Sequence, residues 1–92
     1  MPTEMYNPAH PGRVLREYLK DMNVTHVAKH IGVSRVMLSK ILNSRAGITA
    51  EMSLRLSAAL GTNPSFWWDM QTNYEFAKAR RKKLPKIGRL AA

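Results

Sequence analysis

The first candidate for functional chemistry is a polar helix face within residues 30–45, HIGVSRVMLSKILNSR. This face has no acidic residue and is rich in hydrogen-bond donors: Arg35, Ser39, Lys40, Asn43 and Arg45. Such donors bind the phosphate oxygens and base edges of nucleic acids. The opposite face carries Val33, Leu38, Ile41 and Leu42, which is typical of a packed helix. A polar face is also typical of simple solvation, so the residue types alone leave both interpretations open.

Histidines suggest a second kind of site, because His26 and His30 lie four residues apart on one helix face. That spacing suits two ligands of a metal ion, but no third ligand accompanies them, which favours surface or packing histidines. The sequence has no cysteine, and it shows no Ser/His/Asp set or pair of acids at a convincing site. We therefore expect neither an enzyme nor a bound metal or cofactor.

Apolar residues at helical spacing predict five helices and no strand, and hence an all-α fold. The first helix is predicted at 11–22, with Pro11 at its first position and His10 helping to start it. Its inner face comprises Val14, Leu15, Tyr18, Leu19 and Met22. A short second helix is predicted after Thr25 as N-cap, with Val27, Ala28 and Ile31 facing inward.

The second and third helices have the spacing of a helix-turn-helix arrangement. Gly32 is suited to the left-handed conformation that ends a helix, and Ser34 is suited to cap the third helix, which runs to about Asn43. Ala28 must be small because the third helix crosses close above it. Val33 and Leu38 are placed to form a hydrophobic staple around the Ser34 cap.

Two further helices complete the prediction. Thr49 is the expected N-cap of the fourth helix, and Gly61 is its expected end. Its inner side comprises Met52, Leu56, Ala59 and Leu60. Asn63 is predicted to cap a fifth helix that has Pro64 at its first position and ends before Pro85.

Charge and composition indicate one small domain with a basic tail. We expect a flexible arm at 1–10, the helix-turn-helix domain with its fifth helix at 11–83, and a basic tail at 84–92. The net charge is +9, but residues 1–77 carry only +2 and residues 78–92 carry +7. No signal peptide or membrane-length apolar run occurs, so we expect a cytoplasmic, nucleoid-associated protein without a membrane partner.

Three segments of the chain resemble the Cro/C1-type (lambda repressor-like) helix-turn-helix family, and within it the HigA (VapI-like) antitoxins. They are HPGRVLREYL at 10–19, HIGVSRVMLSKILNSRAGITAEMSLRLSAALG at 30–61, and NPSFWWDMQTNYEFAKA at 63–79. RAGIT followed by LG, P and FW separates this group from phage repressors. The resemblance implies a dimer that binds a palindromic operator in double-stranded DNA and neutralises a HigB-type ribonuclease toxin.

The resemblance also implies which residues contact DNA. The third helix is similar to the family's recognition helix, which enters the major groove. The base-facing positions are then Arg35, Val36, Ser39 and Lys40. Phosphate contacts are expected at Thr25, Ser34, Asn43 and Arg45. Arg35 suits guanine, and the methyl groups of Val36 suit the methyl group of thymine.

The fifth helix has two apolar faces. Core packing accounts for Phe66, Trp67, Met70, Tyr74 and Ala77. A second face is a candidate interface for a dimer or a protein ligand: Trp68, Thr72 and Phe76. A partly exposed tryptophan covered by the tail is the alternative.

Two matters stay open at this level. The basic run KARRKKLPK is a solvated tail, a phosphate-binding extension or a contact to an acidic partner protein. The function is that of an antitoxin and repressor, of a lone Cro/C1-type transcription regulator without a toxin, or of a protein-interaction antitoxin with little DNA affinity.

Overall fold

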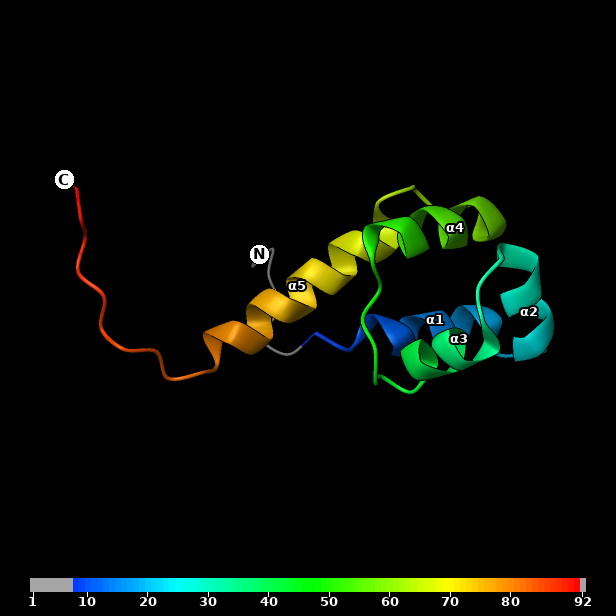
Figure 1. The fold of residues 1–92 in the computed structure, drawn as a ribbon, viewed down its shortest axis with the longest axis horizontal. Helices are drawn as coiled ribbons and strands as arrows, with labels where there is room; N and C mark the ends of the chain where they lie inside the picture. The colour runs from blue at the N-terminus through cyan, green and yellow to red at the C-terminus, as the bar shows by residue number, and fades with distance from the viewer. Residues whose placement is uncertain (1–7, 92) are drawn as a thin grey trace.

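The computed structural model describes residues 8–91, and within them the chain forms five α-helices and no strand, as predicted. The helices are α1 (Pro11–Leu19), α2 (Val24–Ile31), α3 (Arg35–Leu42), α4 (Ala50–Leu60) and α5 (Phe66–Arg80). Helix α1 packs on α3 and on α5, and α4 packs along the first part of α5 (Figure 1). The far half of α5 extends out of this bundle and leads into the C-terminal segment (Figure 1).

One hydrophobic core joins all five helices. Its largest fully buried side chain is that of Trp67 on α5. The other members come from α1 to α4 and the α3–α4 loop: Leu15, Leu19, Val27, Ala28, Ile31, Leu38, Ile41, Leu42, Ile48, Met52 and Leu56. The indole Nε1 of Trp67 donates to Thr62 Oγ1 at 3.1 Å, so burial of the ring leaves no unpaired donor.

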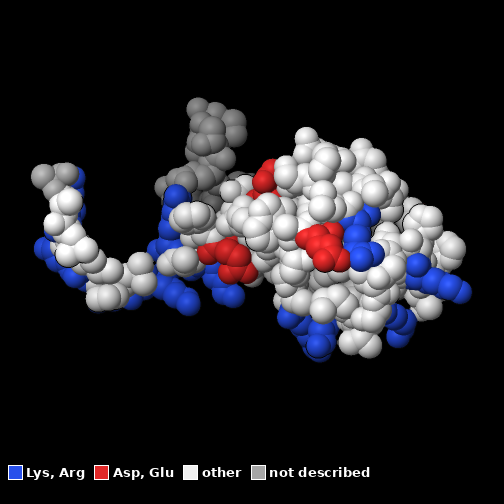
Figure 2. Space-filling model, turned by 45° about the horizontal axis from the view of Figure 1, so that its top comes forward, with Lys and Arg blue, Asp and Glu red and all other residues white. Residues whose placement is uncertain are grey.

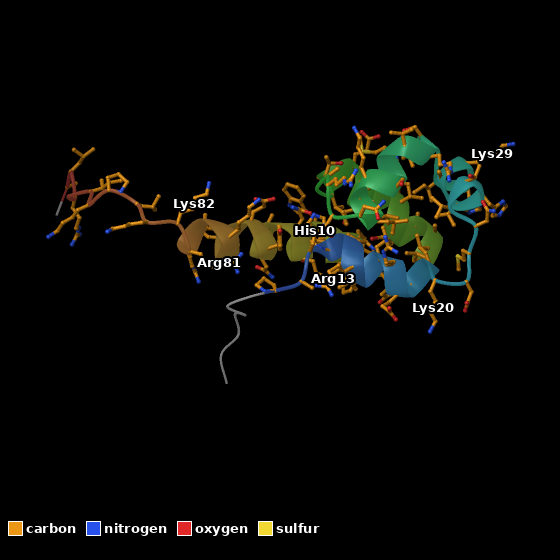
Figure 3. The ribbon with its side chains drawn as sticks, turned by 90° about the horizontal axis from the view of Figure 1, so that it is seen from below. His10, Arg13, Lys20, Lys29, Arg81 and Lys82 are labelled. Carbon is orange, nitrogen blue, oxygen red and sulfur yellow. The ribbon has the colours of Figure 1, made fainter. Side chains whose placement is uncertain are left out.

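Helix α1 begins with His10, whose Nδ1 accepts a hydrogen bond from the Gly12 N–H at 2.9 Å. His10 is buried and packs edge-on against Tyr74 of α5, with ring centroids 4.9 Å apart. His10 therefore belongs to the folded domain rather than to the predicted arm at 1–10, of which residues 1–7 lie outside the described part. Its predicted role in starting the helix is confirmed. Figure 3 shows His10 where the start of α1 meets α5.

Gly12 lies where α1 crosses α3. A Cβ atom at this position would overlap the carbonyl oxygen of Ile41 in α3. The absence of a side chain at Gly12 therefore allows the two helix backbones to approach this closely.

Helix boundaries and faces differ from the prediction in α1, α2 and α4. Helix α1 ends at Leu19 rather than residue 22, and both Tyr18 and Met22 are exposed. The cap of α2 is Asn23, because its Oδ1 accepts from the His26 N–H at 3.0 Å, and Thr25 lies inside the helix. Ala59, expected on the inner side of α4, is exposed.

Helix α5 also begins later and ends earlier than predicted. Asn63 does not cap it, since its Oδ1 accepts from the Ser65 N–H and hydroxyl in the preceding turn, each at 3.0 Å. Pro64 lies in that turn, and the helix begins at Phe66. It ends at Arg80, five residues before Pro85. The sequence placed this end too late because the two apolar faces along the helix gave no signal for its last turn.

The predicted caps Ser34 and Thr49 are confirmed. Their hydroxyl oxygens accept from the N–H groups of Met37 and Met52, at 3.0 and 3.1 Å. Gly32 and Gly61 end α2 and α4, as predicted, with φ values of 78° and 74°. The left-handed conformation was predicted for Gly32, and the structure shows it at Gly61 as well. No helix of residues 8–91 is long and apolar enough to cross a membrane.

The cap formed by His10 makes the free energy of unfolding dependent on pH. Burial lowers the pKa of His10 below the ordinary histidine value; Glu75 opposes this effect and Lys78 adds to it. The cap needs an unprotonated Nδ1, so its contribution is present above the ordinary histidine pKa and is lost as the pH falls through the lowered value. We expect His10→Asn, which keeps a cap acceptor but does not titrate, to remove this part of the pH dependence.

Urea unfolding of the unaltered protein and of His10→Asn between pH 7.5 and pH 4.5 measures this change in the free energy of unfolding. Its expected size is about 1 kcal/mol, the usual contribution of an N-cap. His26 and His30 are exposed in both proteins, so they cancel in the comparison. Parallel pH profiles for the two proteins would contradict the assignment.

Candidate nucleic-acid interface

The turn between α2 and α3 is tightly closed. Ala28 is buried beneath it, as predicted, and its carbonyl accepts from the Val33 N–H at 3.0 Å. Gly32 donates to the Lys29 carbonyl at 3.3 Å. Val33 is partly buried against the same core that contains Leu38, which places both at the ends of the expected staple. These contacts fix the direction in which α3 leaves the turn.

Arg55 of α4 completes the turn from the other side. Its Nη1 donates to the Ile31 carbonyl at 2.8 Å, which satisfies one of the free carbonyls at the end of α2. Its Nη2 forms an ion pair with Glu51 at 2.9 Å, one helical turn earlier. A Cβ on Gly32 would come within 2.8 Å of Arg55 Nη1. Sequence reasoning missed Arg55, although its spacing from Glu51 was a usable signal.

Helix α3 buries one face and leaves the other in solvent. Leu38, Ile41 and Leu42 are buried, as predicted. Arg35, Val36 and Lys40 are exposed on the opposite side, and Ser39 is half-buried beside them. Val36 is 64% exposed, so its methyl groups are accessible on the same face.

The expected phosphate contacts fall into two groups. Ser34 and Thr25 lie at the N-terminal ends of α3 and α2, where backbone N–H groups without helical partners bind anions well. Arg45 follows α3 and is exposed, held by a hydrogen bond from its N–H to the Lys40 carbonyl at 2.8 Å. Asn43 is the C-cap of α3, and its amide takes part in bonds within the protein.

Arg16 of α1 holds the C-terminal end of α3. Its Nη2 donates to Asn43 Oδ1 at 2.7 Å, and its Nε donates to the Leu42 carbonyl at 3.2 Å. Asn43 Nδ2 in turn donates to the Ser39 carbonyl at 2.9 Å. Asn43 Nδ2 also lies 3.4 Å from Ser39 Oγ, so both the oxygen and the nitrogen of this amide are engaged. A guanidinium group not foreseen from the sequence thus lies at this end of α3. Arg16 lies one turn after Gly12, and that register was the available signal.

The loop after α3 is attached to α5 through one buried amide. Gln71 Oε1 accepts from the Ile48 N–H at 2.9 Å, and Gln71 Nε2 donates to Glu75 at 2.9 Å. A Cβ on Gly47 would come within 2.9 Å of Gln71 Nε2, so the loop lies directly on the amide. Sequence reasoning also missed Gln71, which lies four residues after Trp67 on the buried face of α5.

Comparison with known proteins agrees with this geometry. The family model described as helix-turn-helix matches residues 15–67. The chain belongs to the helix-turn-helix family. Virulence-associated protein A' of Dichelobacter nodosus is 35% identical over 89 residues, 94% of this chain and 77% of that protein.

Solved structures narrow the resemblance within this family. The antitoxin HigA of Pseudomonas aeruginosa, solved with the higBA promoter, is 34% identical and has a TM-score of 0.76 over 79% of this chain and 83% of its own. The antitoxin GraA in complex with its operator is 31% identical and has a TM-score of 0.80 over 100% of this chain and 99% of its own. The resemblance to HigA-type helix-turn-helix antitoxins is therefore confirmed.

The outer face of α5 lies away from the helix-turn-helix. Trp68 is 41% exposed and Phe76 is 66% exposed. Thr72 between them is half-buried, and its hydroxyl donates to the Asp69 carbonyl at 3.0 Å. Trp68 also borders a shallow groove with Ala50, Ser53, Leu54, Pro64 and Ser65. Leu54 of α4, which the sequence did not single out, is 58% exposed and widens this apolar surface.

The two histidines of α2 lie on its exposed side. The ring centroids of His26 and His30 are 6.4 Å apart. Within residues 8–91 no group of three His, Cys, Asp or Glu side chains is arranged to hold a metal ion. Both rings instead border an apolar groove of the helix-turn-helix domain with Leu19, Met22, Leu56 and Leu60.

Arg16 should contribute to the stability of this helix-turn-helix domain. We expect Arg16→Met to lower the free energy of unfolding by about 1–2 kcal/mol, because two hydrogen bonds from a charged donor are lost. Arg13→Met is the matched control, since Arg13 is exposed on the same helix and its side chain makes no hydrogen bond within residues 8–91. Urea unfolding compares the two variants, and equal destabilisation would show that Arg16 acts only through its charge.

Proposed function

We propose that this chain is a DNA-binding repressor that recognises a palindromic operator as a homodimer and also neutralises a HigB-type ribonuclease toxin. The observation that carries the proposal is the exposed face of α3, which presents Arg35, Val36 and Lys40 from a helix fixed on its other side by core packing. The operator-bound relatives GraA and HigA support the same use of this fold.

Base recognition is assigned to the outer face of α3. Arg35 lies at the first position of the helix, where its guanidinium is suited to a paired contact with O6 and N7 of guanine. Val36 offers its methyl groups to the methyl group of thymine, and Ser39 and Lys40 follow one turn later.

Phosphate contacts position the protein on the duplex without reading its sequence. Ser34 and Thr25 are assigned to this role through the N-terminal ends of their helices. Arg45 and Asn43 are assigned to it beyond the other end of α3. Asn43 is exposed, and its Nδ2, which donates to Ser39 within the protein, is the atom assigned to the phosphate, since its oxygen accepts from Arg16.

Dimerisation is assigned to the outer face of α5 through Trp68, Thr72 and Phe76. A single module contacts few phosphates and binds weakly, whereas a two-fold dimer places two recognition helices about 34 Å apart on a palindrome. Large aromatic side chains such as Trp68 are enriched at the centres of protein interfaces.

The toxin assignment is supported by similarity to HigA antitoxins. A reading frame for a small basic ribonuclease directly beside this gene would support it. Without such a neighbour, a transcription regulator that has no toxin is the better description.

Substitution of Arg35 tests the assignment of base recognition to α3. We expect Arg35→Ala to lower affinity for the chain's own promoter by about 5- to 150-fold relative to a random duplex, equivalent to about 1–3 kcal/mol of discrimination. Footprinting on the promoter should then lose protection of an inverted repeat. Lys20→Ala is the control, because Lys20 points away from α3 (Figure 3). Absence of any protection by the unaltered protein at moderate salt would refute the proposal.

Substitution of Trp68 tests the interface. We expect Trp68→Ala to weaken self-association or toxin binding while leaving the melting temperature nearly unchanged, because the ring is already 41% exposed. Sedimentation and thermal unfolding measure the two properties. Met22→Ala, with 51% exposure on another surface, serves as control. A large fall in melting temperature without an assembly defect would contradict the assignment.

A further inference from the structure

The segment after α5 has no helix or strand and stands apart from the body. Residues 81–91 are exposed throughout, and the chain runs away from the helices beyond the end of α5 (Figure 1). Three aliphatic side chains in it are largely or fully exposed: Leu84 at 66%, Ile87 at 80% and Leu90 at 106%. A soluble segment that leaves three such groups in water while carrying many charges is a candidate for binding a partner.

The sequence of this segment repeats every three residues. Residues 82–90 divide into KKL, PKI and GRL, with a basic residue in the second place and an aliphatic residue in the third. The basic positions are Lys83, Lys86 and Arg89. The aliphatic positions are Leu84, Ile87 and Leu90. We call residues 82–90 the basic arm.

A three-residue repeat matches the polyproline II conformation, which has three residues per turn. Pro85 favours that conformation and disfavours a helix at Leu84 before it. In it, the three basic side chains would share one edge of the arm, about 9 Å apart, and the three aliphatic side chains would share another. The basic arm is therefore suited to present a regular row of positive charges to a partner.

The charge of the arm favours a polyanion as this partner. Residues 78–92 carry +7 without one acidic residue, whereas the rest of the chain holds all six acidic residues and still carries a net +2. Figure 2 shows Lys and Arg side chains along this segment, and the acidic side chains visible in that view lie toward the body. Figure 3 shows Lys82 projecting from the end of α5 on the side opposite to Arg81. No ion pair of Lys83, Lys86 or Arg89 occurs within residues 8–91.

We propose that the basic arm binds the phosphates of DNA that flanks the site read by α3, through Lys83, Lys86 and Arg89. The choice of flanking DNA rests on the proposed function, whereas binding of phosphates by the arm does not. The aliphatic edge faces away from the phosphates. The arm would raise affinity for all DNA sequences alike, because phosphate contacts carry no sequence information.

The test is the salt dependence of DNA binding. The arm variant replaces Lys83, Lys86 and Arg89 by Gln, and the matched control replaces Leu84, Ile87 and Leu90 by Ser while keeping every charge. Binding to a promoter duplex and to a random duplex of equal length is measured over a range of salt concentrations. The slope of log K against log salt is negative, and each lost phosphate contact reduces its magnitude by about 0.9. On both duplexes we expect the magnitude of this slope to fall by about 2.7 per bound chain in the arm variant and to stay unchanged in the control.

Two results would overturn the proposal: an unchanged slope in the arm variant, or an equal loss in the aliphatic control together with a changed oligomeric state. The second result would assign the arm to a protein contact. Failure of the proposed function is separate, since it would appear as equal affinity of the unaltered protein for promoter and random duplex. The arm would still be tested on the random duplex in that case.

Discussion

The position of α3 depends on the close approach of α1 at Gly12. Because Gly12 has no side chain, the backbone of α3 can lie directly on the first turn of α1. A Cβ at this position would overlap the carbonyl oxygen of Ile41. Arg16, one turn further on, bonds to the end of α3 from the same helix. Two contacts along one short helix therefore fix both the depth and the direction of the helix to which DNA reading is assigned, and the core behind Leu38 completes its support.

A chain of hydroxyl groups sets the angle between α4 and α5. Ser53 donates to the Pro64 carbonyl at 2.8 Å and accepts from the Trp68 N–H at 3.1 Å. Ser57 donates to the Asn63 carbonyl at 2.8 Å and accepts from the Thr62 hydroxyl. These buried serines bind the turn between the helices, so Trp67 enters the core while Trp68 next to it remains at the surface. A small hydroxyl residue suits both positions, because an aliphatic side chain would lose these bonds to the turn, and at Ser53 also the bond from the Trp68 N–H.

The sequence was sufficient to predict the five helices, the helix ends at Gly32 and Gly61 and the caps at Ser34 and Thr49, because each follows from local chemistry. It misplaced the cap of α2, since Asn23 and Thr25 are both good N-caps and the choice depends on where the chain leaves α1. The burial of one face of α3 was predictable from its period.

The backbone partners of Arg16, Arg55 and Gln71 were not predictable, because each bonds to a group more than 20 residues away in the sequence. The spacing of Arg16 from Gly12 and of Arg55 from Glu51 indicates which helix face each side chain lies on, but not which distant backbone group it reaches. The proposed contacts of the outer face of α3 with DNA would likewise be a property of the complex rather than of the isolated helix.

The amide of Gln71 has a consequence for the spacing between half-sites that the proposed dimer would accept. It attaches the loop after α3 to the middle of α5, the helix that carries the assigned dimer face on its other side. In a dimer joined through α5, the two α3 helices would then be held at a fixed distance and orientation. Such a dimer would tolerate a changed base better than an inserted one. An extra base pair between the half-sites shifts one half-site along the duplex and rotates it about the axis, and rigidly spaced α3 helices could not adjust to both changes.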